Sequence, residues 1–164
     1  MENKTDITGL KKAIDSRDAL ELRKLSKRYS MEAVVEQSDD IINLAIISYC
    51  LNKVLSKVHF SEKIDTLIYY VREKLEKGDL AGAISSIESF DEEHGLFHGN
   101  LVYKARVKVG SRMYSSGISL TQAASLVDIK VSEILEYSGY TKGDEETRHK
   151  SLGERVAVVR RLFD

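Results

Sequence analysis

The chain has 164 residues, a formal net charge of −1, a single Cys, and no Trp or Pro. This length suits one domain, or one domain with a short appendage. Hydrophobic residues make up 42% of the chain, which is enough to bury a core. One cysteine excludes an internal disulfide framework, and the absence of proline favours long helices over a loop-rich or all-β fold. The near-neutral charge removes the argument for nucleic-acid binding that a wholly basic domain would give.

No feature of the sequence indicates a membrane protein or a secreted one. The first six residues are polar and no apolar signal core follows them. The longest apolar stretch, 41–55, is interrupted by Asn43, Ser48, Asn52 and Lys53, so no run reaches the roughly 18 residues that a membrane span needs. We therefore expect a cytoplasmic protein without membrane contact.

Apolar residues at helical spacing dominate the first hundred residues. They predict helices at about 7–14, 18–29, 39–58, 61–75 and 79–90, with a short helix or helical turn at 30–35. The helix at 39–58 is apolar almost all round, which is typical of a helix in the centre of a bundle. The stretch 91–100 contains Gly95 and Gly99 and is predicted to be a connection.

The remaining residues predict further helices. One runs from about 101 to 116 and ends at Gly117, although the alternation over 103–109 leaves a short strand as an alternative. Two short helices follow, the second ending at Gly139, and then a polar stretch at 141–150 that we expect to be mobile. Ser151 and Glu154 form a capping box for a last helix with an apolar side. The sequence predicts an all-α multihelical bundle, with an interaction or dimerisation platform at 1–99 and a C-terminal part at 100–164.

The segment 120–138 carries the most specific pattern in the chain. Ser119 and Gln122 form a capping box, Ala123 and Ala124 would allow a second helix to cross closely, and Asp128 marks a tight turn. Two apolar residues, Ile134 and Tyr137, follow at helical spacing. The pattern resembles a helix-turn-helix motif, although that family usually has glycine at the turn where this chain has Asp128.

The resemblance implies that the protein is a DNA-binding regulator, in the manner of small antitoxin-like proteins that join a DNA-binding unit to a partner-binding tail. In that family the second helix enters the major groove. Here this helix is poorly suited to contact bases in the major groove. Lys130 is its only basic residue, and Glu133 and Glu136 would repel phosphates. The alternative is a helical protein-interaction module without nucleic-acid contact.

A second feature favours the DNA hypothesis. Lys104, Lys108 and Arg112 are spaced by four without an acid between them, so they form one stripe that could follow a phosphate backbone. A solvated helix face is the alternative for this stripe, and also for the cluster at 155–161. The residues predicted to contact DNA are Lys104, Lys108, Arg112, Thr121, Gln122, Lys130 and Ser132.

The sequence holds no catalytic constellation, phosphate loop or dinucleotide fingerprint, so we expect neither an enzyme nor a cofactor. His94 and His98 are four apart, as in some zinc sites, but Gly95 interrupts the helix and no third ligand is placed. No metal is therefore expected. The expected partners are DNA and a second copy of the chain. Another protein docked on the C-terminal helix is a further candidate, because the apolar side of such a short helix must be buried somewhere.

Overall fold

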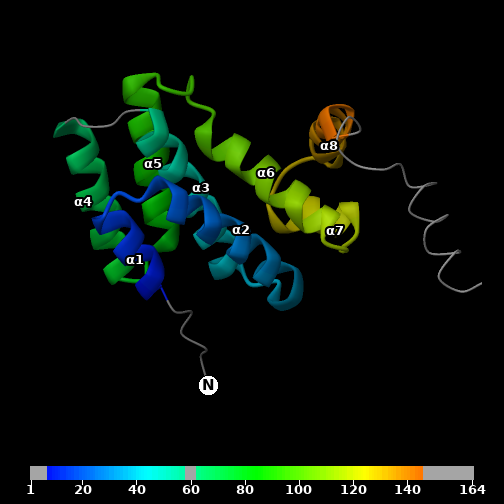
Figure 1. Ribbon diagram of the computed structural model, residues 1–164, viewed down its shortest axis with the longest axis horizontal. Coiled ribbons are helices and arrows are strands. Elements are labelled where there is room, and N and C mark those ends of the chain that lie inside the picture. The colour runs from blue at the N-terminus through cyan, green and yellow to red at the C-terminus, as the bar shows by residue number, and fades with distance from the viewer. Residues whose placement is uncertain (1–6, 58–61, 146–164) are drawn as a thin grey trace, which may run out of the picture.

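The computed structural model describes residues 7–57 and 62–145, with side chains to residue 139, and all its regular elements there are helices (Figure 1). In chain order they are α1 (Thr8–Asp15), α2 (Ala19–Glu36), α3 (Asp39–Lys57), α4 (Glu62–Glu76), α5 (Leu80–His94), α6 (Leu101–Ser115), α7 (Leu120–Leu126) and α8 (Val131–Glu145). The expected all-α multihelical fold is therefore confirmed. None of these helices is long and apolar enough to cross a membrane.

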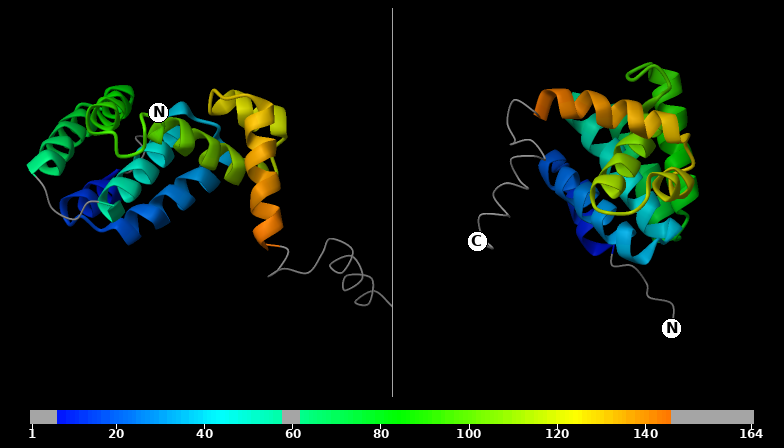
Figure 2. Two further views of the ribbon diagram at one scale, coloured as in Figure 1. Left: turned by 90° about the horizontal axis from the view of Figure 1, so that it is seen from above. Right: turned by 90° about the vertical axis from the view of Figure 1, so that its right-hand side faces the viewer.

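Helix α3 lies at the centre of the fold, as its apolar sequence predicts. It packs against α2, α5 and α6, and twelve of its residues are buried. Helix α4 packs on α5 and α1 at one end of the molecule, while α7 and α8 lie at the other (Figure 2). The two ends are joined through α6, which packs against α2, α3 and α5 as well as α7 and α8. The expected division at residues 99–100 thus falls at the start of a helix that contacts both parts.

Local capping explains where several helices begin. The Asp18 side chain accepts from the backbone N–H of Glu21 at 2.9 Å, and Asp79 does the same for Gly82 at 2.8 Å. Such caps satisfy backbone donors that have no partner within the helix. The turn before α6 is held differently, because the buried carboxylate of Asp91 accepts from the N–H groups of Phe97 and Leu101.

The structure corrects several predicted boundaries. The short helix expected at 30–35 is the continuous end of α2, which stops only at Gln37 in the left-handed conformation. Helix α5 extends through residues 91–94 of the expected connection. Helix α8 does not stop at Gly139 but continues to Glu145, so the first half of the polar stretch 141–150 is helical. Favourable backbone hydrogen bonding outweighs polar composition where no Pro interrupts the chain.

Two predictions remain for the second half of the chain: the alternative of a strand at 103–109 and the last helix. Residues 103–109 are helical, so the alternative of a short strand is wrong. The predicted last helix, with its capping box at Ser151 and Glu154, lies outside the described residues.

Candidate functional site

Helices α7 and α8 form a hairpin that packs across α6. Ala123 and Ala124 are buried, as predicted for a close helix crossing, and Asp128 adopts the left-handed conformation at φ 54° in the turn. Asp reaches this region more readily than most residues. The Arg106 guanidinium donates to the backbone carbonyl of Val127 at 3.1 Å, which ties the end of α7 to α6.

Gly110 of α6 lies where the hairpin comes closest. A Cβ atom built there would be 2.8 Å from Val127 and 2.9 Å from Ile134. Both of these side chains are fully buried. The absence of a side chain at Gly110 therefore allows the turn and α8 to sit directly on α6, a contact that sequence analysis did not anticipate.

The outer face of α8 is apolar and acidic. Val131 and Leu135 are 36% and 49% exposed, and Glu136 is exposed beside them. The Glu133 carboxylate accepts from the backbone N–H of Lys130 at 2.9 Å, so it caps the helix start. A helix with this face would bring negative charge toward DNA phosphates if it entered a major groove.

Four of the predicted DNA contacts lie on the surface of this hairpin. Thr121, Gln122, Lys130 and Ser132 are all exposed. Gln122 is also engaged with the main bundle, because its amide donates to the side-chain oxygen of Gln37 at 2.9 Å. None of the four lines either of the two cavities described below.

The predicted basic stripe on α6 faces a groove instead of bulk solvent. Arg112 is half-buried and donates to the hydroxyl of Ser26 at 2.9 Å. The Lys108 ammonium lies 5.1 Å from the ring centre of Tyr137, within cation–π range. Both side chains are therefore partly covered by neighbouring residues, while Lys104 remains exposed.

Two further cations join Lys108 and Arg112 around a cavity of about 320 Å³, which we call the basic cleft. Arg23 comes from α2 and Lys53 from α3. The complete lining is Arg23, Ser26, Tyr49, Asn52, Lys53, Ser56, Lys108, Arg112 and Tyr137. Sequence analysis missed Arg23 and Lys53, because nothing local to α2 or α3 distinguishes them from other surface cations.

The basic cleft carries uncompensated positive charge. Among the described residues no Asp or Glu lines it, and none forms an ion pair with any of its four cations. Arg112 has a neutral hydroxyl as its hydrogen-bond acceptor where a half-buried guanidinium usually has a carboxylate. Burial lowers the pKa of Arg112 and the charge of Arg23 lowers it further, against the opposing effect of Tyr49 and Tyr137. A guanidinium nevertheless stays protonated in proteins, so the cleft remains cationic.

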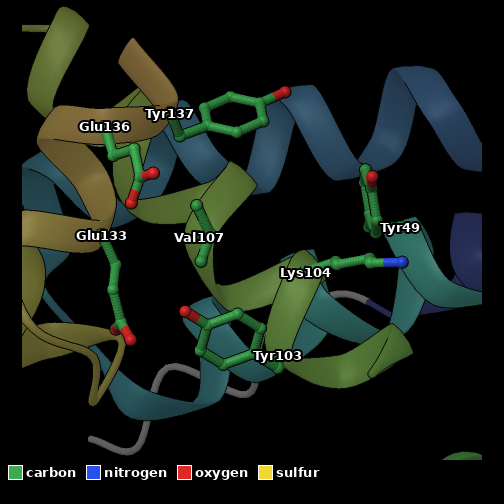
Figure 3. Close-up of a pocket in the computed structure, with 7 residues that line it drawn as sticks. All are labelled: Tyr49, Tyr103, Lys104, Val107, Glu133, Glu136 and Tyr137. Atoms are coloured by element: carbon green, nitrogen blue, oxygen red, sulfur yellow. The ribbon is translucent and has the colours of Figure 1, made fainter. Parts of the chain in front are cut away.

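A second cavity, of about 380 Å³, adjoins the basic cleft, and we call it the tyrosine pocket (Figure 3). It is lined by Tyr49, Tyr103, Lys104, Val107, Glu133, Glu136 and Tyr137. Tyr49 and Tyr137 line both cavities. The Tyr103 hydroxyl hydrogen-bonds Glu133, which raises the pKa of the tyrosine and lowers the pKa of the carboxyl. The pKa of Tyr49 is raised chiefly by burial.

The structure also places the two histidines considered as metal ligands, and the single cysteine. His94 ends α5, where its ring stacks on Phe90 and contacts the Phe90 carbonyl, while His98 lies in the following turn with φ 59°. The part of the chain that the structure describes holds no group of three metal-ligating side chains. Cys50 is fully buried, and burial raises the pKa of its thiol.

The comparisons with known proteins add no relative. No family model, curated protein or solved structure matches this chain. The fold and the site therefore define the molecule by themselves, as an all-α protein with a basic cleft and an adjoining tyrosine pocket between its central helices and its C-terminal hairpin.

Proposed function

We propose that this protein binds nucleic acid and that the basic cleft, not the outer face of α8, contacts the phosphates. The observation that carries the proposal is the set of four cations around the cleft with no carboxylate partner among the described residues. Charges that are unneutralised within the protein and share one concave surface attract an anionic ligand. Arg and Lys side chains are the usual partners of nucleic-acid phosphates.

The positions of the cations support contact with several phosphates of one strand. Arg23, Lys53 and Lys108 come from three different helices, and Lys104 lies on α6 one turn before Lys108. The half-buried Arg112 is oriented by Ser26, so it presents a fixed guanidinium to an oxygen in the cleft. This proposal keeps Lys104, Lys108 and Arg112 as contact residues. It gives Thr121, Gln122, Lys130 and Ser132 at most a peripheral place.

Titration with salt tests the proposal. A random-sequence single strand and its duplex are titrated with the full chain at several salt concentrations, with binding followed by fluorescence anisotropy. The triple variant Arg23→Gln, Lys53→Gln, Lys108→Gln should bind more weakly, and its log–log salt slope should be lower by about two to three, since each phosphate contact contributes about 0.7 to 0.9.

The matched control removes the same charge elsewhere. Lys12, Lys63 and Lys77 are exposed residues of α1, α4 and the segment after α4, and none lines the cleft. Their triple Gln variant should keep nearly all of the affinity and slope. If the wild-type chain binds neither strand form at low salt, or if the two triple variants lose affinity equally, the proposal is wrong.

A helical protein-interaction module is the second candidate, favoured by the exposed Val131 and Leu135 on α8. A second copy of the chain is the partner that the sequence predicts. Light scattering on the full chain and on the variant Leu135→Glu tests it. A dimer that the variant converts to monomer would support self-association through α8. A wild-type monomer would contradict the homodimer, and a truncation after Glu145 would show whether residues 146–164 are needed for any dimer that forms.

A further inference from the structure

The basic cleft and the tyrosine pocket form two compartments that share two walls. Tyr49 and Tyr137 line both of them. One compartment is cationic, and the other is bounded by aromatic rings, Val107, two carboxylates and Lys104. A ligand that spans both would need an anionic group connected by a short linker to a flat ring.

We propose that the two compartments bind a single strand of nucleic acid, with phosphates in the basic cleft and one unstacked base in the tyrosine pocket. This inference rests on the proposed function and names the form of nucleic acid that the site takes. Single-strand binders combine a positive groove for the backbone with aromatic side chains on which bases stack. The tyrosine pocket, at about 380 Å³, falls within the size range of ligand pockets.

The side chains of the tyrosine pocket are arranged to receive a planar group. Figure 3 shows Tyr103 and Tyr137 on opposite sides of Val107, and all three residues line the pocket. Tyr103 is 44% exposed, so its ring surface is available for stacking. The Lys108 ammonium lies against the ring of Tyr137, the residue that lines both compartments. A cation therefore lies at their boundary, where the sugar and phosphate attached to a bound base would pass.

The two carboxylates orient the ligand. Glu133 is already engaged with Lys130 and Tyr103, whereas Glu136 has no hydrogen bond to any described residue and directs its carboxylate toward Val107 in Figure 3. Negative charge there repels phosphate and therefore favours the base. A carboxylate accepts hydrogen bonds from exocyclic amino groups, so cytosine, which offers one, should be preferred over thymine, which offers none.

A paired duplex does not meet these requirements. A base enters a pocket only after it leaves the stack and loses its pairing partner. The helix that would have to lie in a major groove presents Leu135 and Glu136, neither of which contacts phosphate favourably. The site thus favours single strands over duplexes of the same sequence.

Four labelled probes test this with the full chain: an oligo-dC strand of about ten nucleotides, within the usual single-strand site sizes, an oligo-dT strand and an abasic strand of equal length, and a matched duplex. Wild-type protein should bind oligo-dC about tenfold or more tighter than the abasic strand, as expected for stacking of a base. It should bind oligo-dC more tightly than the duplex and more tightly than oligo-dT. Glu136→Gln should reduce the preference for dC over dT.

Tyr103→Ala provides the decisive variant, with Tyr69→Ala as its control, because both tyrosines are exposed and Tyr69 lies on α4. Tyr103→Ala should lose about tenfold in oligo-dC affinity and bind the abasic strand like the wild type, with its helical circular dichroism spectrum retained. Tyr69→Ala should change neither affinity.

The outcomes separate this inference from the proposed function. If the abasic strand or the duplex binds as tightly as oligo-dC, or if Tyr103→Ala weakens both single strands equally, the base pocket is wrong while phosphate binding in the cleft stands. If no strand binds at low salt, the proposed function fails and this inference fails with it.

Discussion

The outer face of α8 and the basic cleft are neighbouring surfaces of opposite charge character. The former presents Leu135 and Glu136 on α8, the second helix of the hairpin, for which the sequence analysis predicted contact with DNA. The latter gathers four cations from α2, α3 and α6, and Tyr137 is the one residue of α8 up to position 139 that lines it. The comparison shows that the backbone pattern of a motif and the charge needed for its usual function are separate properties. A short sequence pattern can fix how two helices cross, while charges that reach a ligand depend on which helices lie next to them.

The largest expected effect is on the free energy of unfolding, when a buried side chain of α8 is truncated and compared with an exposed one. Ile134 is fully buried against α6, so Ile134→Ala should lower the free energy of unfolding by about 2–5 kcal/mol through lost burial and a cavity. The adjacent Leu135 is 49% exposed, and Leu135→Ala should stay within about 0.5 kcal/mol. Urea unfolding followed by circular dichroism measures both. Equal losses would mean that α8 is not docked through Ile134.

A smaller effect is expected at the crossing of the hairpin. Ala124 is buried on α7, so Ala124→Leu should force α7 and α8 apart and cost about 1–3 kcal/mol, as overpacking typically does. Ser125 is its exposed neighbour, and Ser125→Leu should be close to neutral. If Ala124→Leu leaves the melting temperature unchanged, the close crossing is wrong at the residue on which the motif most depends.

Substitution of a buried hydroxyl tests how the cleft is held. Ser26→Ala removes the acceptor for Arg112 and the donor to the Ala45 carbonyl, and should cost about 1 kcal/mol. Ser30, one turn later and equally buried, bonds only the Ser26 carbonyl of its own helix. Ser30→Ala should therefore cost less. Chemical denaturation compares the two variants, and a greater loss for Ser30→Ala would contradict a positioning role for Ser26.

The smallest expected effect concerns the tyrosine pocket. The Tyr103 hydroxyl and the Lys130 N–H lower the pKa of Glu133, so the stability it contributes is present above the unfolded-state pKa and is lost as the pH falls through the folded-state value. Tyr103→Phe should raise the pKa of Glu133 part of the way back to its ordinary value. Carboxyl chemical shifts followed against pH measure this change. Tyr69→Phe should leave the Glu133 pKa where it is, and an unchanged value in Tyr103→Phe would rule out the hydrogen bond.

The sequence by itself determined the helices and the packing of the hairpin. Apolar spacing identified the central helix α3, the side chains of Asp79 and Ser119 mark helix starts in both sequence and structure, and Ala123, Ala124 and Asp128 behave as the pattern requires. These features depend on neighbours within a few residues along the chain, which is why a local pattern predicts them. The end of α8 was missed because Gly139 permits a helix to stop without enforcing it, and no Pro follows to break the helix.

Only the tertiary structure decided where the charges meet. Spacing by four placed Lys104, Lys108 and Arg112 on one side of α6, but it could not show whether that side faces water or a groove. Arg23 and Lys53 reach the same cleft because α2 and α3 pack against α6. Such long-range contacts are set by the packing of whole helices, since a cation on a polar helix face looks the same in the sequence whether or not another helix lies beside it.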